Sequence, residues 1–353
     1  MIAKKLVLPF LILIMIAFNS FGNEQLPKKV ECKIEIMPNY IWHLFAAANI
    51  WNIENSKYAS LYGKSIPDDD KELLFTNREL LSWGNGIISK FTPLLFFIPF
   101  SQEITPNQYW DYLEITIKTM KSNSWDNFAD QYCPSEKNRI VSFQFTNDDI
   151  NKFIEIKNVI KRNFSIYENT IWDSQKKYLI DEKNSIDLFF AKQDIIKAWE
   201  QKLDIAYNAD GFYPVLTYAN GIDNLVSANN LSTSRNNFAV SIGNTNNTID
   251  LMIHEIGIFT LWNTIMVIYS DPLYQTTEFQ KTNVVYQAVE SYIEIIKGKI
   301  TGSMSEWEGK MYSGESFEFG WFFNFYKDKI GTYRSEKLIR EAIIEFSKAR
   351  KKT

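Results

Sequence analysis

The sequence predicts an α+β protein, in which a mostly helical region precedes a domain that combines a small sheet with helices. Three features support this class. Through the first half of the chain, apolar residues recur mostly at helical spacing. Two β-rich segments, 212–218 and 237–242, follow and are separated by a stretch rich in Asn and Ser. The segment 249–269 is then apolar on nearly every face, which is typical of a buried helix.

The N-terminus has the pattern of an export signal. Lys4 and Lys5 precede an apolar run of 13 residues, and small residues follow where a signal peptidase would cleave. This run is too short to span a bilayer of about 30 Å. We therefore expect a signal peptide at 1–22, a helical region at 23–204 and a second domain at 205–353, in a protein exported to the periplasm or the extracellular space.

Six helices are predicted in the N-terminal region, mostly from apolar stripes at helical spacing. Trp110, Leu113 and Ile117 share one face of the longest of them. Another helix is expected to begin after Pro67, because three acids fill its first turn. The longest of these helices is expected at 107–132, and the remaining four are expected at 40–62, 148–163, 169–182 and 193–203.

Two short strands are expected among these helices, at 94–100 and 139–145. The second alternates apolar residues with Ser142 and Gln144, the period of a half-buried strand. The run 91–100 is interrupted by two prolines, and no segment after the leader is expected to cross a membrane.

Three helices are expected after the β-rich segments. Asn247 is a candidate N-cap for the apolar helix 249–269. Helices at 283–297 and 335–348 follow, and the last one has a continuous apolar stripe. The aromatic run 314–323 is expected to form either a pocket wall or part of the core.

Composition excludes several classes of function. The formal net charge of -4 does not supply the basic field that a nucleic-acid binder needs. Two histidines and two cysteines are too few for a site of four cysteines or three histidines, so metal chemistry would depend on carboxylates. Neither a Gly-rich phosphate loop nor a Gly-x-Ser-x-Gly motif occurs. Cys32 and Cys133 are expected to be either a disulfide or two buried thiols.

Ionisable residues stand in the middle of the apolar helix 249–269, where unpaired burial would cost several kcal/mol. Asp250, His254 and Glu255 must therefore find partners. Glu290 and Glu294 lie one turn apart on the next predicted helix and are candidates.

This arrangement resembles the gluzincin zinc metallopeptidases, the thermolysin-like group, whose central helix carries the motif H-E-x-x-H. The resemblance covers about residues 205–300. It implies that His254 is the first zinc ligand, Glu255 the general base and Glu290 the third ligand. It also implies that Glu294 orients the ligating histidine. The strand before the helix would then bind peptides by adding them to the sheet.

The sequence departs from the family at Ile258, which stands where the second histidine would be and cannot ligate zinc. A rewired set of metal ligands could use Asp250 with His254 and Glu290, or could include His43 from the N-terminal region. Alternatively, Asp250 and His254 form a hydrogen-bonded pair in the core, Glu290 and Glu294 a solvated face, and His43 an ordinary core histidine.

These alternatives give three hypotheses of function. The first is a metallopeptidase-like protein with impaired catalysis that binds a peptide or protein. The second is an active metal-dependent peptidase with rewired ligands. The third is a non-catalytic structural protein of the cell envelope. Nucleic acid is expected in none of them, and neither is a membrane once the leader is removed.

Overall fold

The computed structural model describes residues 28–50, 56–81, 83–84, 87–134, 137–207, 210–219, 239–241, 245–274, 284–302, 317–331 and 334–350. The expected signal peptide and most of the polar stretch between the two β-rich segments lie outside these residues. The chain is mostly helical, and the described strands form three sheets of two strands each.

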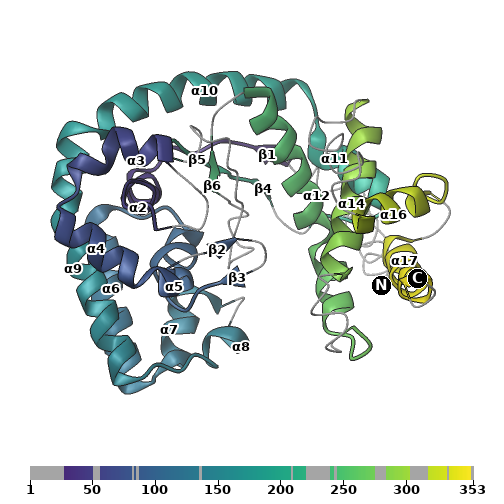
Figure 1. Ribbon diagram of the computed structural model, residues 1–353. Coiled ribbons are helices and arrows are strands. Elements are labelled where there is room, and N and C mark those ends of the chain that lie inside the picture. Colours follow the sequence, from purple (N-terminus) through teal and green to yellow (C-terminus); the bar gives the residue numbers. More distant parts are fainter. Residues whose placement is uncertain are drawn as a thin grey trace, which may run out of the picture.

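The N-terminal region is a group of helices around one aromatic-rich core. In Figure 1 most of these helices lie on the left, the long α10 passes over the top, and α11 lies on the right near α12 and α14. The helices are α2 (Ile36–Ala47), α3 (Ser56–Tyr62), α4 (Asp68–Thr76), α5 (Arg78–Leu81), α6 (Pro106–Ser122), α7 (Trp125–Tyr132), α8 (Lys137–Ile140), α9 (Asn147–Thr170), α10 (Trp172–Lys192) and α11 (Ile195–Leu203).

Local signals explain where most of these helices begin and end. The helix after Pro67 is present, with its three acids in the first turn. Thr105 and Thr146 cap α6 and α9 with reciprocal hydrogen bonds to the third helical residue. The segment predicted as one helix at 107–132 is divided, because Asn123 adopts a left-handed conformation between α6 and α7.

Both strands predicted in the N-terminal region are wrong. Residues Pro93–Phe97 form a π-helical turn and Pro99–Ser101 a 3-10 turn. All of these residues are buried, and a continuous apolar run is as compatible with a buried helical turn as with a strand. Each turn begins with a proline, whose fixed φ suits the first residue of a helical turn. In the second segment α8 extends to Ile140, and the alternating residues after it pair with no strand in the part of the chain described.

Among the described residues, the C-terminal part contains short strands and four helices. Residues of β1 (Lys29–Val30) pair in parallel with β4 (Gly211–Phe212), and β5 (Val215–Thr217) pairs in parallel with β6 (Ala239–Ser241). The strands β2 (Trp83–Gly84) and β3 (Ile87–Ile88) form a separate antiparallel pair. The helices are α12 (Thr245–Tyr269), α14 (Val284–Thr301), α16 (Phe317–Tyr326) and α17 (Ser335–Arg350).

Hydrogen bonds cross the boundary that the sequence suggested at residue 204. The strand β1 belongs to the N-terminal region but pairs with β4. The side-chain amide of Asn39 donates to the carbonyl of Leu216 at 2.9 Å and accepts from the amide of Tyr218 at 3.0 Å. The two regions therefore share one continuous core. Cys32 and Cys133 are both buried as free thiols.

Helix α12 differs from its prediction in two respects. It begins at Thr245, whose hydroxyl donates to Glu182 at 2.7 Å, so Asn247 lies inside the first turn and is not the cap. Among the described residues it is also long and apolar enough to cross a membrane, contrary to the expectation from the sequence. Half of its most apolar window is buried inside the protein.

Gly257 lets the indole of Trp199 lie directly against α12. A Cβ atom at residue 257 would be 2.5 Å from this ring, and Trp199 Nε1 donates to the carbonyl of Ile253 at 2.9 Å. The close neighbour of this glycine is therefore a side chain.

We expect Gly257→Ala to destabilise the protein by about 1–3 kcal/mol, because the added methyl group forces Trp199 out of place. Gly320 in α16 is a matched control, since a Cβ there meets nothing within 4 Å. Gly320→Ala should be neutral or stabilise by up to about 1 kcal/mol through helix propensity. Chemical denaturation of both variants measures the difference. Equal effects would contradict this account of Gly257.

Candidate functional site

The candidate site lies where α12 packs against α14. His254 is buried in the middle of α12, and both of its ring nitrogens meet carboxylates from α14. The Nε2 atom is 3.0 Å from Glu290 Oε2, and Nδ1 makes a short contact with Glu294 Oε1. Carboxylates only accept hydrogen bonds, so both nitrogens donate and the ring is an imidazolium. Burial opposes this charge, but Glu290 and Glu294 outweigh it and raise the pKa of His254 well above its ordinary value.

A buried lysine continues this chain of charges. Lys297, also on α14, places its Nζ atom 2.8 Å from Glu294 Oε2 and 2.8 Å from Asp250 Oδ2. Burial lowers the pKa of Lys297, but the charges of Glu294 and Asp250 raise it above the ordinary value. We call the five residues Asp250, His254, Glu290, Glu294 and Lys297 the ionic cluster.

The structure brings together some of the residues proposed from the sequence and separates others. Glu290 and Glu294 both contact His254, which excludes the alternative that they form a solvated face. Asp250 bonds to Lys297, so the carboxylate suggested as a replacement ligand is held by a cation. Lys297 was not among the predicted site residues. Its signal was a lysine three residues after Glu294 on the same predicted helix.

His43 lies in a different environment, on α2 among tyrosines. Its Nδ1 is 2.8 Å from the hydroxyl of Tyr58, and its ring packs against Tyr62 and Tyr167. Burial lowers the pKa of His43 to about 3, so this ring is neutral. His43 is therefore a core histidine bonded to a phenol.

Glu255, the residue that matches a general base, is next to the ionic cluster. Burial raises the pKa of Glu255 to about 8, with smaller and opposing contributions from His254, which lowers it, and from Glu290 and Glu294, which raise it. A carboxyl group with this pKa is mostly protonated at neutral pH.

The cluster does not fit a resident zinc ion. His254 Nε2 and Glu290 are two donors on one side, whereas protein zinc sites use three or four protein ligands. Ile258 packs against the core and offers no donor. Across the described ranges, no three His, Cys, Asp or Glu side chains converge as metal ligands would.

The cluster is mostly closed to solvent. The side chains of His254 and Glu290 are 7% and 11% exposed, those of Glu294 and Lys297 are each 1% exposed, and Asp250 is the most exposed member at 32%. The half-exposed Tyr286 lies close enough to Glu290 and Glu255 for their charges to raise its pKa, after the larger effect of burial. Tyr269 is affected in the same way by Glu290, and its pKa is about 12. Other exposed apolar side chains near Tyr269 in the chain are Met266 and Val267 on α12 and Leu273 in the turn after this helix.

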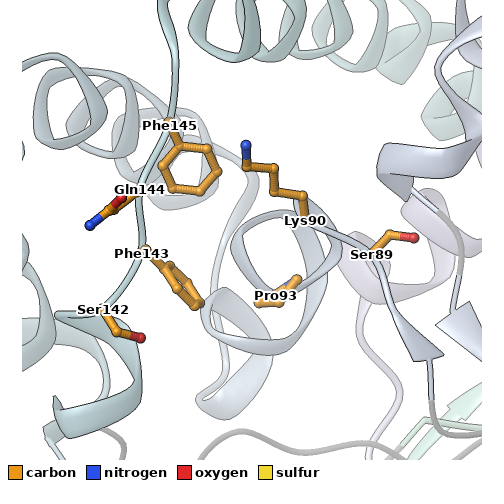
Figure 2. Close-up of a pocket in the computed structure, with 7 residues that line it drawn as sticks. All are labelled: Ser89, Lys90, Pro93, Ser142, Phe143, Gln144 and Phe145. Atoms are coloured by element: carbon orange, nitrogen blue, oxygen red, sulfur yellow. The ribbon is translucent and has the colours of Figure 1, made fainter.

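A cavity of about 370 Å³ lies in the N-terminal region, away from these residues (Figure 2). Phe143, Phe145 and Pro93 surround it, and Lys90 lies at its rim. The ammonium of Lys90 is 2.6 Å from Asp149 Oδ2, so its charge is already paired. The sequence did not indicate this cavity, because its aromatic residues Phe143 and Phe145 were expected in a strand.

Comparisons of the chain with protein-family models, with curated proteins and with solved structures give no match.

We expect Glu294→Ala to destabilise the protein by about 3–5 kcal/mol, because it leaves two buried cations without their shared carboxylate. Glu345→Ala is the control, since Glu345 forms an exposed pair with Lys348. This control should cost no more than about 1 kcal/mol. Equilibrium unfolding in urea measures both, and a similar small loss for Glu294→Ala would contradict the role assigned to the cluster.

Glu255 should make the protein less stable as the pH rises from about 4.5 to about 8. In this window the unfolded chain releases the proton at the ordinary pKa near 4.5, but the folded protein retains it up to about 8. The loss should be on the order of 3 kcal/mol. Glu255→Gln removes this term, so its unfolding free energy should fall less between pH 5 and pH 8. Parallel profiles for the two proteins would contradict the prediction.

Proposed function

We propose that this chain is an exported, metallopeptidase-like protein of the gluzincin type that has lost its metal site and binds peptide or protein segments without cleaving them. The observation that carries the proposal is the imidazole of His254 held between Glu290 and Glu294. The resemblance implies this arrangement for the first ligand, the third ligand and the acid that orients the histidine.

Four features favour loss of catalysis. Ile258 leaves one ligand position without a donor, and Lys297 engages the carboxylate of Asp250. Burial raises the pKa of Glu255 to about 8, so only a minor fraction of this carboxyl group is ionised and able to accept a proton from water at neutral pH. His43, the other suggested ligand, is bonded to Tyr58. These contacts disfavour the alternative of an active peptidase with rewired ligands.

Two features favour retained binding. The strand β6 precedes α12 and, among the described strands, pairs only with β5 on one side. An extended peptide would add to the other side of β6. Close to Glu290, Tyr286 and Tyr269 present partly exposed aromatic rings, which are common anchors in recognition surfaces.

Binding to an unfolded chain tests the proposal. Reduced, carboxymethylated α-lactalbumin is a suitable probe, with fluorescence anisotropy as the readout. We expect saturable binding that Tyr286→Ala weakens about tenfold, through loss of an aromatic anchor. The control is Tyr178→Ala, a tyrosine of similar exposure on α10, which should leave the affinity unchanged.

The same samples separate the alternatives. Cleavage of the probe on addition of zinc, abolished by Glu255→Gln, would contradict the proposal and favour an active peptidase. Absence of both binding and cleavage would contradict it and favour a structural role in the cell envelope.

A further inference from the structure

The cavity in the N-terminal region has the size and the lining of a small-molecule site. Its volume of about 370 Å³ falls within the range of about 300–1,000 Å³ that such sites occupy. Phe143, Phe145 and Pro93 present aromatic and aliphatic rings to it (Figure 2). Among the described residues that line it, Lys90 is the only charged one. This lining suits a ligand with an apolar body and one anionic group.

Neighbouring aromatic side chains hold the walls of the cavity in place. The ring centroid of Trp125 lies 5.6 Å from that of Phe143 and 5.5 Å from that of Phe145. Phe91 also contacts Phe145, with 6.1 Å between the ring centroids. Gln144 points away from the cavity, so the alternation along this segment places both phenylalanine rings on the cavity side (Figure 2). A ligand would therefore meet two rings whose positions are fixed before it binds.

Lys90 is held at the rim by an ion pair that does not use all of its donors. Its ammonium lies 5.3 Å from the ring centroid of Phe145 and 2.6 Å from Asp149 Oδ2. The backbone amide and the hydroxyl of Thr146 also donate to this carboxylate. Asp149 is not among the residues that line the cavity, so the cavity meets the positive end of the pair. An ammonium group has three N–H donors, which leaves Lys90 able to bind a second acceptor.

We propose that this cavity binds a small aromatic carboxylate, with the ring of the ligand against Phe143 and Pro93 and its carboxylate on the ammonium of Lys90. This chemistry occurs in free acids and at the C-terminus of peptides that end in an aromatic residue. The inference does not rest on the proposed function, because the cavity is formed by neither the ionic cluster nor β6.

Probes of similar shape and different charge test the proposal on the purified full chain. Phenylpropionate is compared with its neutral analogue phenylpropanamide and its cationic analogue phenylpropylamine, in titrations followed by ligand-detected NMR. We expect phenylpropionate to bind with a dissociation constant on the order of 1 mM or tighter. The amide and the amine should bind at least about fivefold more weakly, because a hydrogen bond between two ionised groups is the stronger one.

Two further probes define the ligand. Cyclohexylpropionate keeps the carboxylate but lacks the aromatic ring, and it should bind more weakly than phenylpropionate. The peptide Gly-Gly-Phe carries the same ring and carboxylate at a C-terminus. Tighter binding of this peptide than of phenylpropionate would identify a peptide C-terminus as the source of the ligand, and weaker binding would identify a free acid. Both results agree with the proposal.

Variants of Lys90 test the role of its charge. Lys90→Met keeps the apolar stem and should weaken phenylpropionate binding about fivefold, to the level of the amide. Lys152→Met is the matched control, because the side chain of Lys152 is 41% exposed, against 40% for Lys90, and also pairs with an aspartate. It should leave the affinity unchanged. Lys90→Arg keeps the charge and should retain binding.

Four results would overturn the proposal. The first is that none of the probes binds, and the second is that the wild type binds phenylpropionate and its amide equally. These two need no variant to fold. The third is an unchanged affinity for phenylpropionate in Lys90→Met. The fourth is equal binding of cyclohexylpropionate and phenylpropionate, which would contradict recognition of an aromatic ring.

Discussion

The contact between α12 and α14 depends on the buried chain of opposite charges from His254 through Glu294 to Lys297. Apolar helix surfaces pack in several registers, but these charges are compensated in only one. Asp250 precedes His254 on α12, and its partner Lys297 follows Glu290 on α14, so the two helices must run antiparallel. A shift by one turn would leave buried charges unpaired, at a cost of several kcal/mol. The polar groups therefore specify how the apolar surfaces meet.

A second contact to the same turn of α12 comes from α11. Trp199 occupies the space that Gly257 leaves and donates a hydrogen bond to the carbonyl of Ile253. The turn of α12 that carries His254 therefore meets an indole from α11 and two carboxylates from α14. Ile258 belongs to the same turn and packs against the core. A histidine there would have to displace apolar contacts.

The sequence identified the groups in the site but not all of their partners. A histidine inside an apolar helix must be paired, and Glu290 and Glu294 were the nearest acids one turn apart, so their contacts with His254 could be anticipated. Asp250 could pair with His254 one turn later on its own helix or with a cation on a neighbouring helix, and the local sequence does not distinguish these two pairings. Lys297 was missed because a lysine near the end of an amphipathic helix is usually solvated. The two strands predicted in the N-terminal region were wrong for a related reason, because the periodicity of apolar residues does not show whether a partner strand exists.

The members of the cluster differ in exposure, and this difference constrains what the site can do. Glu294 and Lys297 are closed to solvent, so they contribute to helix packing. His254 and Glu290 are also mostly buried, and both nitrogens of His254 already donate to carboxylates, so the ring has no lone pair with which to accept a proton. Asp250 is the most exposed member, and its carboxylate is bonded to Lys297. Under the proposed function, recognition of a ligand therefore falls to groups around the cluster, among which Tyr286 is the most accessible aromatic side chain described near it.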